Sequence, residues 1–162
     1  NGRSIGDPHM DYKLSWLRAW GQAVADWSTE HPGEGVIIGG DFNVAPLPSD
    51  VGDPSFVEGV STHVSIEERS TLAESTAHAG VVDLVRPLVP EGYTYWDYTQ
   101  GKFRKNEGMR IDFLFGNQVV ADQVSAAHIE REQRTGEQPS DHVPVVVTLE
   151  GDEEFDERPM VF

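Results

Sequence analysis

The most informative segment of the chain runs Gly35-Val36-Ile37-Ile38-Gly39-Gly40-Asp41-Phe42-Asn43. Its apolar run, Val36 to Ile38, is short, continuous and bounded by glycines, which predicts a β-strand buried on both faces. Two polar side chains, Asp41 and Asn43, follow the run at once. Functional sites are commonly built on loops at the ends of such strands. The segment therefore predicts an α/β fold with a candidate site where one of its central strands ends.

The rest of the chain alternates helical and strand-like patterns without repeats or a linker, which favours a single domain. Apolar residues at steps of three and four predict an amphipathic first helix, whose three tryptophans are expected to pack in the core. Ser65 and Glu68 form a capping-box pattern that opens a second helix, and Gly80 is a plausible end for it. The expected helices cover residues 11–27, 65–79, 81–88 and 118–123, and the β-prone segments cover 36–38, 93–98, 111–115, 125–130 and 143–149.

The composition restricts the chemistry that the chain can perform. Among its 162 residues there is no cysteine, which excludes disulfides, thiolate zinc sites and thiol nucleophiles. Any metal must be held by oxygen or imidazole ligands, and carboxylates suit magnesium and manganese. No apolar run approaches the roughly 18 residues of a membrane span, and no signal peptide is visible. The chain does not begin with methionine, which we interpret as a fragment boundary or a processed start.

The net charge of −16 argues against a nucleic-acid partner, because phosphate binding usually depends on lysine and arginine. Two interpretations are open. Basic residues outside this chain could supply the binding groove, or the acidic surface could serve solubility. Part of the charge is local, since residues 150–162 open with a dense acidic run that is typical of an exposed tail.

Three short polar groups each adjoin a predicted strand: Gly40-Asp41-Phe42-Asn43, Arg110-Ile111-Asp112 and Ser140-Asp141-His142. Each alone is a weak signal, since an aspartate at a strand end is commonly a turn or cap residue. The third group is not a serine-protease triad, because adjacent residues on a strand point to opposite sides. Together they supply a base, hydrogen-bond donors and acceptor oxygens, which is what phosphodiester hydrolysis requires.

The chain resembles the exonuclease III and AP endonuclease branch of the endonuclease/exonuclease/phosphatase superfamily. The matching words are G-G-D-F-N-V-A-P (39–46), E-E-R (67–69), Y-T-Y-W-D-Y (93–98), N-E-G-M-R-I-D (106–112) and P-S-D-H-V-P-V (139–145), in the family's order. The resemblance implies a DNase I-like four-layer α/β sandwich. Residues 1–149 would form the C-terminal portion of that domain, with about one mixed sheet and its helices, followed by the acidic tail 150–162.

The resemblance also implies roles for individual residues. Asp41 would align and deprotonate the attacking water, although the pair of Asp112 and His142 is an alternative base that the sequence leaves open. Asn43 would donate to the scissile phosphate and help to hold Asp41. Asp112 would accept from His142, which would stabilise charge on a phosphate oxygen. Asp141 would help to bind Mg²⁺, for which Mn²⁺ is a possible substitute. Relatives carry an asparagine, a metal-binding glutamate and a tyrosine in about a hundred preceding residues, so this chain alone is expected to be inactive.

Further residues match positions that contact DNA in relatives. Asn1 matches an asparagine that contacts the DNA backbone. An apolar slot for a base-less sugar would be formed by Tyr95, Trp96, Met109 and Ile111, although the aromatic pair could equally be core residues. The dense basic cluster of Lys102, Arg104 and Lys105 would contact phosphates, or could be an ordinary exposed loop.

The function implied is Mg-dependent hydrolysis of DNA in base excision repair, as a 3′→5′ exonuclease on duplex DNA and by incision at abasic sites. The expected partner is double-stranded DNA with abasic sites or 3′-blocked ends, and the expected state is a cytoplasmic, nucleoid-associated monomer with no membrane contact. One alternative is a phosphatase or phospholipase of the same superfamily. Another is a folded but inactive fragment.

Overall fold

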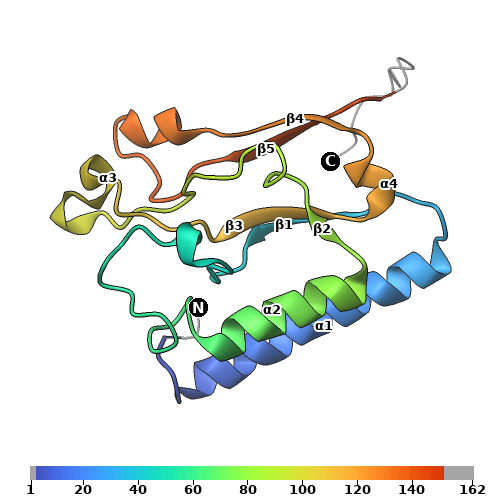
Figure 1. Cartoon of the computed structure of the whole chain (residues 1–162), viewed down its shortest axis with the longest axis horizontal. Coiled ribbons are helices and arrows are strands. Elements are labelled where there is room, and N and C mark those ends of the chain that lie inside the picture. The colour runs from blue at the N-terminus through green and yellow to red at the C-terminus, as the bar shows by residue number, and fades with distance from the viewer. Residues whose placement is uncertain (1–2, 152–162) are drawn as a thin grey trace.

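Two long helices lie side by side and cover one face of a small sheet (Figure 1). In the computed structural model, which describes residues 3–151, α1 spans Pro8–Glu30 and α2 spans Ile66–Ala79. Helix α1 begins at a proline in its first turn, and the carboxylate of Asp7 accepts from the backbone N–H of His9, so the first turn is capped. Both helices were predicted, and α1 is longer at each end than its apolar pattern.

Helix α2 has the ends that its sequence predicts. The Ser65 hydroxyl accepts from the Glu68 backbone N–H at 3.2 Å, and the Glu68 carboxylate accepts from the Ser65 N–H at 3.3 Å, so the capping box is formed. The helix ends at Gly80, which has a φ of 68° in the left-handed region. These two ends set the length of α2.

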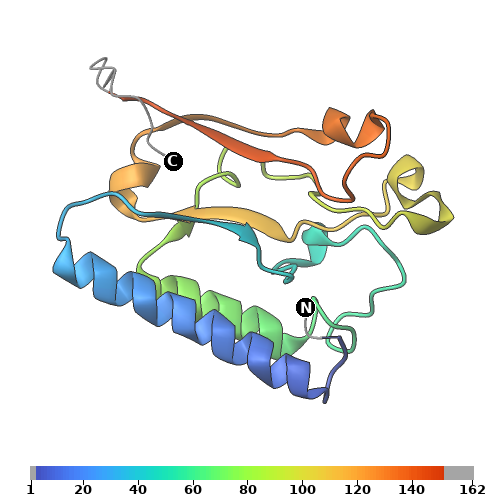
Figure 2. The same cartoon turned by 180° about the vertical axis from the view of Figure 1, so that it is seen from behind.

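The strands form two separate antiparallel sheets (Figures 1 and 2). The first has the order β1–β3–β2, with bounds Ile37–Asp41, Asp112–Gly116 and Val82–Asp83, and the second pairs β4 (Val124–Ile129) with β5 (Val145–Leu149). The α/β fold class is confirmed, but the expectation of about one mixed sheet is corrected. The short helices are α3 (Lys102–Lys105), α4 (Gln118–Ala121), η1 (Pro48–Asp50), η2 (Thr99–Gly101) and η3 (Arg131–Thr135).

The prediction that the first strand is buried on both faces is wrong for β1. This strand lies at the edge of its sheet and pairs only with β3 among the described residues, and Ile37 is 42% exposed. A short apolar run cannot by itself distinguish a central strand from an edge strand. Gly39 serves close packing, since a Cβ there would lie 2.5 Å from Cδ2 of Leu114 on β3.

The short helix predicted over residues 81–88 does not form. Val82 pairs with Gly116 as part of β2, and the Asp83 carboxylate then accepts from the backbone N–H groups of Val85 and Arg86. This side chain offers the backbone a turn in place of a helical hydrogen bond, so the chain bends away from the sheet.

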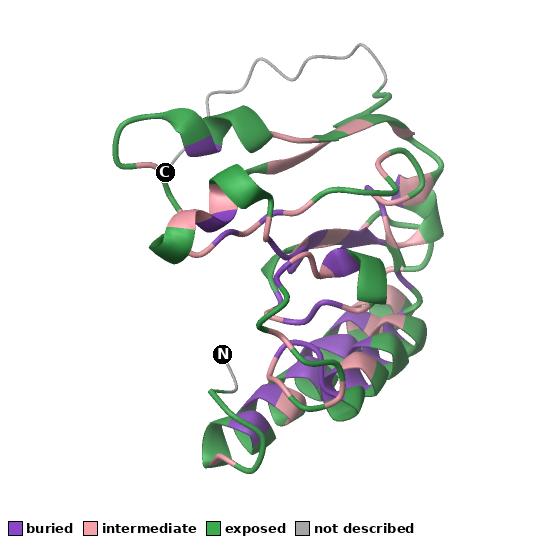
Figure 3. Cartoon of the chain, turned by 60° about the vertical axis from the view of Figure 1, so that its left-hand side comes forward, coloured by how far each residue is buried: buried purple, intermediate pink, exposed green. Residues whose placement is uncertain are grey.

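The main core lies between the helical pair and the first sheet (Figure 3). Of the three tryptophans expected there, Trp20 is 7% exposed and contacts Phe42 edge-on, whereas Trp27 is half-buried and Trp16 is 42% exposed. The prediction for the tryptophans is therefore confirmed for Trp20 alone. No helix in residues 3–151 combines the length and the hydropathy that a bilayer span requires. Most of the predicted tail, residues 152–162, lies outside the described residues.

Candidate active site

The sheet register brings the first two polar groups together. Asp41, the last residue of β1, is the antiparallel partner of Asp112, the first residue of β3. The third group reaches the same end of the sheet through isolated β-bridges, because Tyr95 pairs with both Met109 and His142. Three sequence segments that are far apart along the chain therefore place their polar side chains at one end of the first sheet.

His142 is held by a carboxylate on one side of its ring. Its Nδ1 lies 2.9 Å from Oδ2 of Asp112 and 3.1 Å from Oδ1, so Nδ1 carries the proton and donates to the carboxylate. This hydrogen bond raises the pKa of His142 above its ordinary value, although burial acts in the opposite direction. The other nitrogen, Nε2, lies 4.0 Å from Oδ2 of Asp41, which leaves it able to donate to another group.

Asp41 and Asn43 form a compact loop at the end of β1. The Asn43 backbone N–H donates to Oδ1 of Asp41 at 2.8 Å, and its side-chain amide donates to Oδ2 at 2.5 Å. Asn43 can make both bonds because its φ of 54° is in the left-handed region, which residues other than glycine seldom adopt. Burial and the Asp112 charge raise the pKa of Asp41, and the Asn43 N–H partly offsets them.

A buried threonine, which sequence reasoning missed, joins the segments behind the site. The Thr94 hydroxyl accepts from the backbone N–H groups of Ile111 and Asp112, both at 3.1 Å, and the side chain is fully buried. The Thr94 carbonyl accepts from the Val143 N–H at 2.9 Å. One residue thereby positions the backbone beside both Asp112 and His142. Its place within Y-T-Y-W-D-Y is the sequence signal for it, and the aromatic residues dominate that segment.

Asp141 is half-buried beside His142, and its backbone carbonyl accepts from the Trp96 N–H at 3.0 Å. Its carboxylate is of the type that Mg²⁺ prefers. Within residues 3–151, however, no three His, Asp or Glu side chains converge closely enough to hold a metal ion. Asp141 is therefore the described carboxylate that remains a candidate magnesium ligand, as one of the one or two that Mg²⁺ usually takes from a protein.

The four residues expected to form an apolar slot differ in how far they are buried. Trp96, Met109 and Ile111 are buried to within 2% of complete, as core residues would be, and only Tyr95 is half-exposed. The Tyr95 ring lies 5.0 Å from the His142 ring, so it does border the site. Burial, followed by the charges of Asp97 and Asp141, raises the pKa of Tyr95 to about 12.

The basic cluster is divided by its structure. Lys102 is 7% exposed, and its ammonium group pairs with Asp53 at 2.8 Å and with Glu107 at 2.9 Å. It therefore joins two loops and is not presented to solvent. Arg104 and Lys105 are exposed on α3, as phosphate contacts would need to be. The remaining predicted contact, Asn1, lies outside the described residues.

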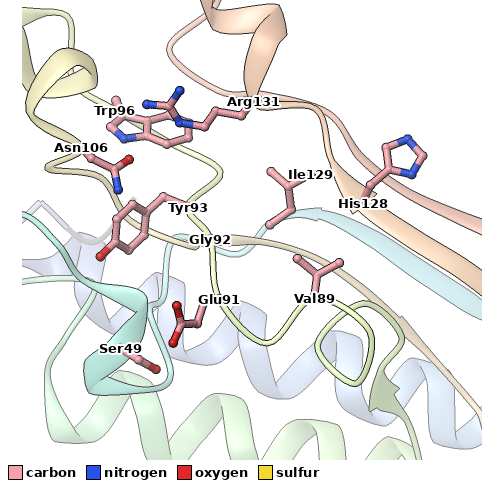
Figure 4. Close-up of a pocket in the computed structure, with 10 residues that line it drawn as sticks. All are labelled: Ser49, Val89, Glu91, Gly92, Tyr93, Trp96, Asn106, His128, Ile129 and Arg131. Carbon is pink, nitrogen blue, oxygen red and sulfur yellow. The ribbon is translucent and has the colours of Figure 1, made fainter.

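A hollow of about 690 Å³ lies elsewhere, between the segment around Gly92 and strand β4 (Figure 4). Trp96 and Arg131 border it, and the Arg131 guanidinium lies 5.6 Å from the Trp96 ring centroid. None of the polar side chains at the end of β1 and β3 lines this hollow. A smaller depression of about 230 Å³ does adjoin them and is lined by Tyr12, Lys13, Trp16, Asp41, Phe42 and Asn43.

The fold and the polar site together define a class of protein. Residues 4–142 match the Endonuclease/Exonuclease/phosphatase family, and the chain belongs to it. Among curated relatives it is 29% identical over 147 residues to an exodeoxyribonuclease of Bacillus subtilis, a match that covers 89% of this chain and 55% of the relative. The chain thus spans about half the length of the curated relatives that it matches.

Solved structures show the same likeness. The 3′ phosphatase NExo from Neisseria, bound to a product DNA hairpin, has 31% identity and a TM-score of 0.84, and the match covers 93% of this chain and 58% of that one. An AP endonuclease from Archaeoglobus fulgidus has 27% identity and a TM-score of 0.79 with the same coverage. These similarities confirm the resemblance to exonuclease III and AP endonucleases and the DNase I-like fold class.

Proposed function

We propose that this chain provides the phosphodiester-hydrolysing residues of a DNA-repair nuclease. The observation that carries the proposal is the convergence of Asp41, Asn43, Asp112 and His142 at one end of the first sheet. The names of the relatives support DNA as the substrate, since they are an exodeoxyribonuclease, an AP endonuclease and a 3′ phosphatase bound to a DNA hairpin. They do not favour a phospholipase.

The geometry supports different roles for the two residue pairs of the site, Asp41 with Asn43 and His142 with Asp112. Asp41 acts as general base: its raised pKa makes it a better proton acceptor, and the two Asn43 hydrogen bonds orient it. Water loses a proton to this carboxylate as its oxygen bonds to phosphorus. The bond from phosphorus to the leaving sugar oxygen breaks, and that oxygen takes up a proton from solvent. Asn43 would also donate from its amide to the scissile phosphate.

His142 stabilises the charge that develops on the phosphate. Its raised pKa keeps the ring protonated closer to neutrality, and Asp112 fixes its orientation through Nδ1. Nε2 can then donate to a phosphate oxygen bound beside the ring, while Asp41 faces the attacking water. This arrangement favours Asp41, and not the histidine pair, as the base.

We also propose a metal cofactor, specific DNA substrates and a cellular location for this nuclease. Mg²⁺, or Mn²⁺ in its place, would supply Lewis-acid stabilisation of the phosphate, with Asp141 as a candidate ligand. The substrates are duplex DNA degraded 3′→5′, abasic sites and 3′-blocked ends, and Tyr95 and the exposed Arg104 and Lys105 are the candidate contacts. We further propose that the protein acts as a cytoplasmic monomer.

The test is incision of a DNA duplex that carries one abasic site, with Mg²⁺ or with EDTA. The assay uses this chain and, beside it, the longest polypeptide that its gene encodes. We expect incision only with the metal and a loss of about 100-fold or more in His142→Ala. Full activity in that variant, or no incision by the longest polypeptide, would refute the proposal, and turnover of an inositol phosphate in its place would identify a phosphatase.

A further inference from the structure

A buried ion pair lies directly behind the left-handed residue of the candidate site. Lys13, on α1, is 5% exposed, and Glu68, on α2, is completely buried. The Lys13 ammonium group pairs with Oε1 of Glu68. Glu68 also accepts from the Ser65 hydroxyl at 2.6 Å and from the Thr62 hydroxyl at 3.2 Å, so its oxygens are fully engaged.

The lysine of this ion pair also donates a hydrogen bond to one backbone carbonyl oxygen of the site. Lys13 Nζ donates to the carbonyl oxygen of Asn43 at 2.5 Å. His63 Nδ1 lies 2.6 Å from the same oxygen, and because a carbonyl can only accept, Nδ1 must carry the proton. His63 is itself buried, and burial lowers its pKa, which favours the neutral ring. Two buried donors from different elements therefore hold a single carbonyl group.

Holding this carbonyl has a consequence for the site. A left-handed φ costs most residues with a Cβ about 1–2 kcal/mol, and asparagine adopts it more readily because its side chain can hydrogen-bond locally, as that of Asn43 does with Asp41. With the carbonyl fixed on one side, the backbone N–H and the side-chain amide of Asn43 both point at Asp41. Asn43 is therefore held from two sides, by the two donors on its carbonyl group and by its own two hydrogen bonds to Asp41.

Stability alone is a poor explanation for the pair. Taking two charges out of water is expensive, and replacing a buried ion pair by neutral residues of similar volume is often neutral or stabilising. Glu68 also needs no charge to complete its capping box, since a glutamine serves equally well at that position.

We propose that Lys13 and Glu68 are positioning residues, which act through the Asn43 carbonyl to keep Asn43 and Asp41 in the arrangement required for hydrolysis. The proposal rests on the proposed function for its catalytic consequence, but the anchoring of Asn43 can be measured without any activity. Lys13 holds the carbonyl, and Glu68 holds Lys13. Neither residue touches the substrate in this scheme.

The experiment compares the wild-type chain with Lys13→Met/Glu68→Gln, in which both charges are removed and the capping box is retained. NMR reports the φ of Asn43 through the strong cross-peak between its own Hα and amide proton that a left-handed residue gives. We expect the double variant to melt cooperatively while this cross-peak weakens and the Asn43 side-chain amide shifts. The matched control is Lys102→Met, which breaks another buried lysine pair and should leave both signals unchanged.

In the longest polypeptide encoded by the gene, the double variant should lower kcat by about 10-fold to 100-fold with little change in KM, because small misplacements of a reacting group have effects of this size. An unchanged Asn43 cross-peak in a folded double variant would overturn the proposal, as would an unchanged kcat. A wild-type protein that does not cleave DNA would refute the proposed function, and the NMR comparison would still decide whether the pair anchors Asn43.

Discussion

At the scale of single residues, Asn43 combines a backbone requirement with a chemical one, and two substitutions separate them. Asn43→Gly keeps the left-handed φ without strain but removes the amide that donates to Asp41. Asn43→Ala removes the amide and adds the strain. We expect both variants to lose about 100-fold in activity compared with the wild-type chain. The free energy of unfolding of Asn43→Ala should be about 1 kcal/mol lower than that of Asn43→Gly. Urea unfolding of the two variants checks this, and equal stabilities would contradict it.

The Asp112–His142 pair predicts a pH dependence of stability. Because the folded-state pKa of His142 is raised, the contribution of the pair is fully present below the unfolded-state pKa and is lost as the pH rises through the folded-state pKa. Asp112→Asn should lower the pKa of His142 and flatten this part of the stability profile. Chemical-shift titration of the imidazole, with urea unfolding at several pH values, measures both effects. A His142 pKa that is the same in the variant would show that another group causes the shift.

The sequence predicted which polar residues gather, but not how they are supported. Asp41, Asn43, Asp112 and His142 could be found because each follows or precedes a recognisable strand. Lys13, His63 and Thr94 could not, because they act through backbone atoms of residues distant in sequence, and such contacts leave no short motif. Burial of Lys102 could not be predicted either, because its side-chain partner Asp53 lies about fifty residues earlier in the chain.

At the scale of elements, the end of α2 can be tested with a matched pair of glycines. Gly80 has a φ of 68° and Gly136 has a φ of −70°, and a Cβ at either position would meet no atom within 4 Å. Only the backbone conformation therefore distinguishes them. Gly80→Ala should destabilise the chain by about 1 kcal/mol, whereas Gly136→Ala should be neutral or stabilise it by about 0.4–1 kcal/mol. Thermal or urea unfolding of both variants provides the measurement, and equal effects would argue against a left-handed Gly80.

The accuracy of the element predictions follows from how local their causes are. Both ends of α2 are set by residues within the helix and beside it, so the capping box and Gly80 were sufficient. The helix predicted over residues 81–88 is wrong because the conformation of this segment depends on pairing between Val82 and Gly116, more than thirty residues away. The edge position of β1 is likewise a property of the sheet order and not of its apolar run.

At the scale of the whole molecule, the net charge of −16 remains the main obstacle to DNA binding. Exposed basic residues of the described structure show which surface could first contact phosphates. Helix α3 presents Arg104 and Lys105 to solvent, and Arg131 of η3 lies over the Phe103 ring of α3 at 4.3 Å. Arg104, Lys105 and Arg131 thus present three exposed cations on two neighbouring elements, where phosphate binding is expected to begin if the chain binds DNA.

This arrangement predicts how salt weakens binding to a DNA duplex. Each lysine or arginine that neutralises a phosphate contributes about 0.9 to the slope of log affinity against log salt. Arg104→Ala and Lys105→Ala should each reduce the slope by about that amount and weaken binding equally for unrelated sequences. Lys102→Met is the matched control, because its ammonium group is already neutralised by Asp53 and Glu107, and it should leave the slope unchanged. Fluorescence anisotropy across a salt series makes the comparison. A slope that falls in the Lys102 variant but not in the other two would show that the buried pair opens to bind phosphate and that the exposed cations do not.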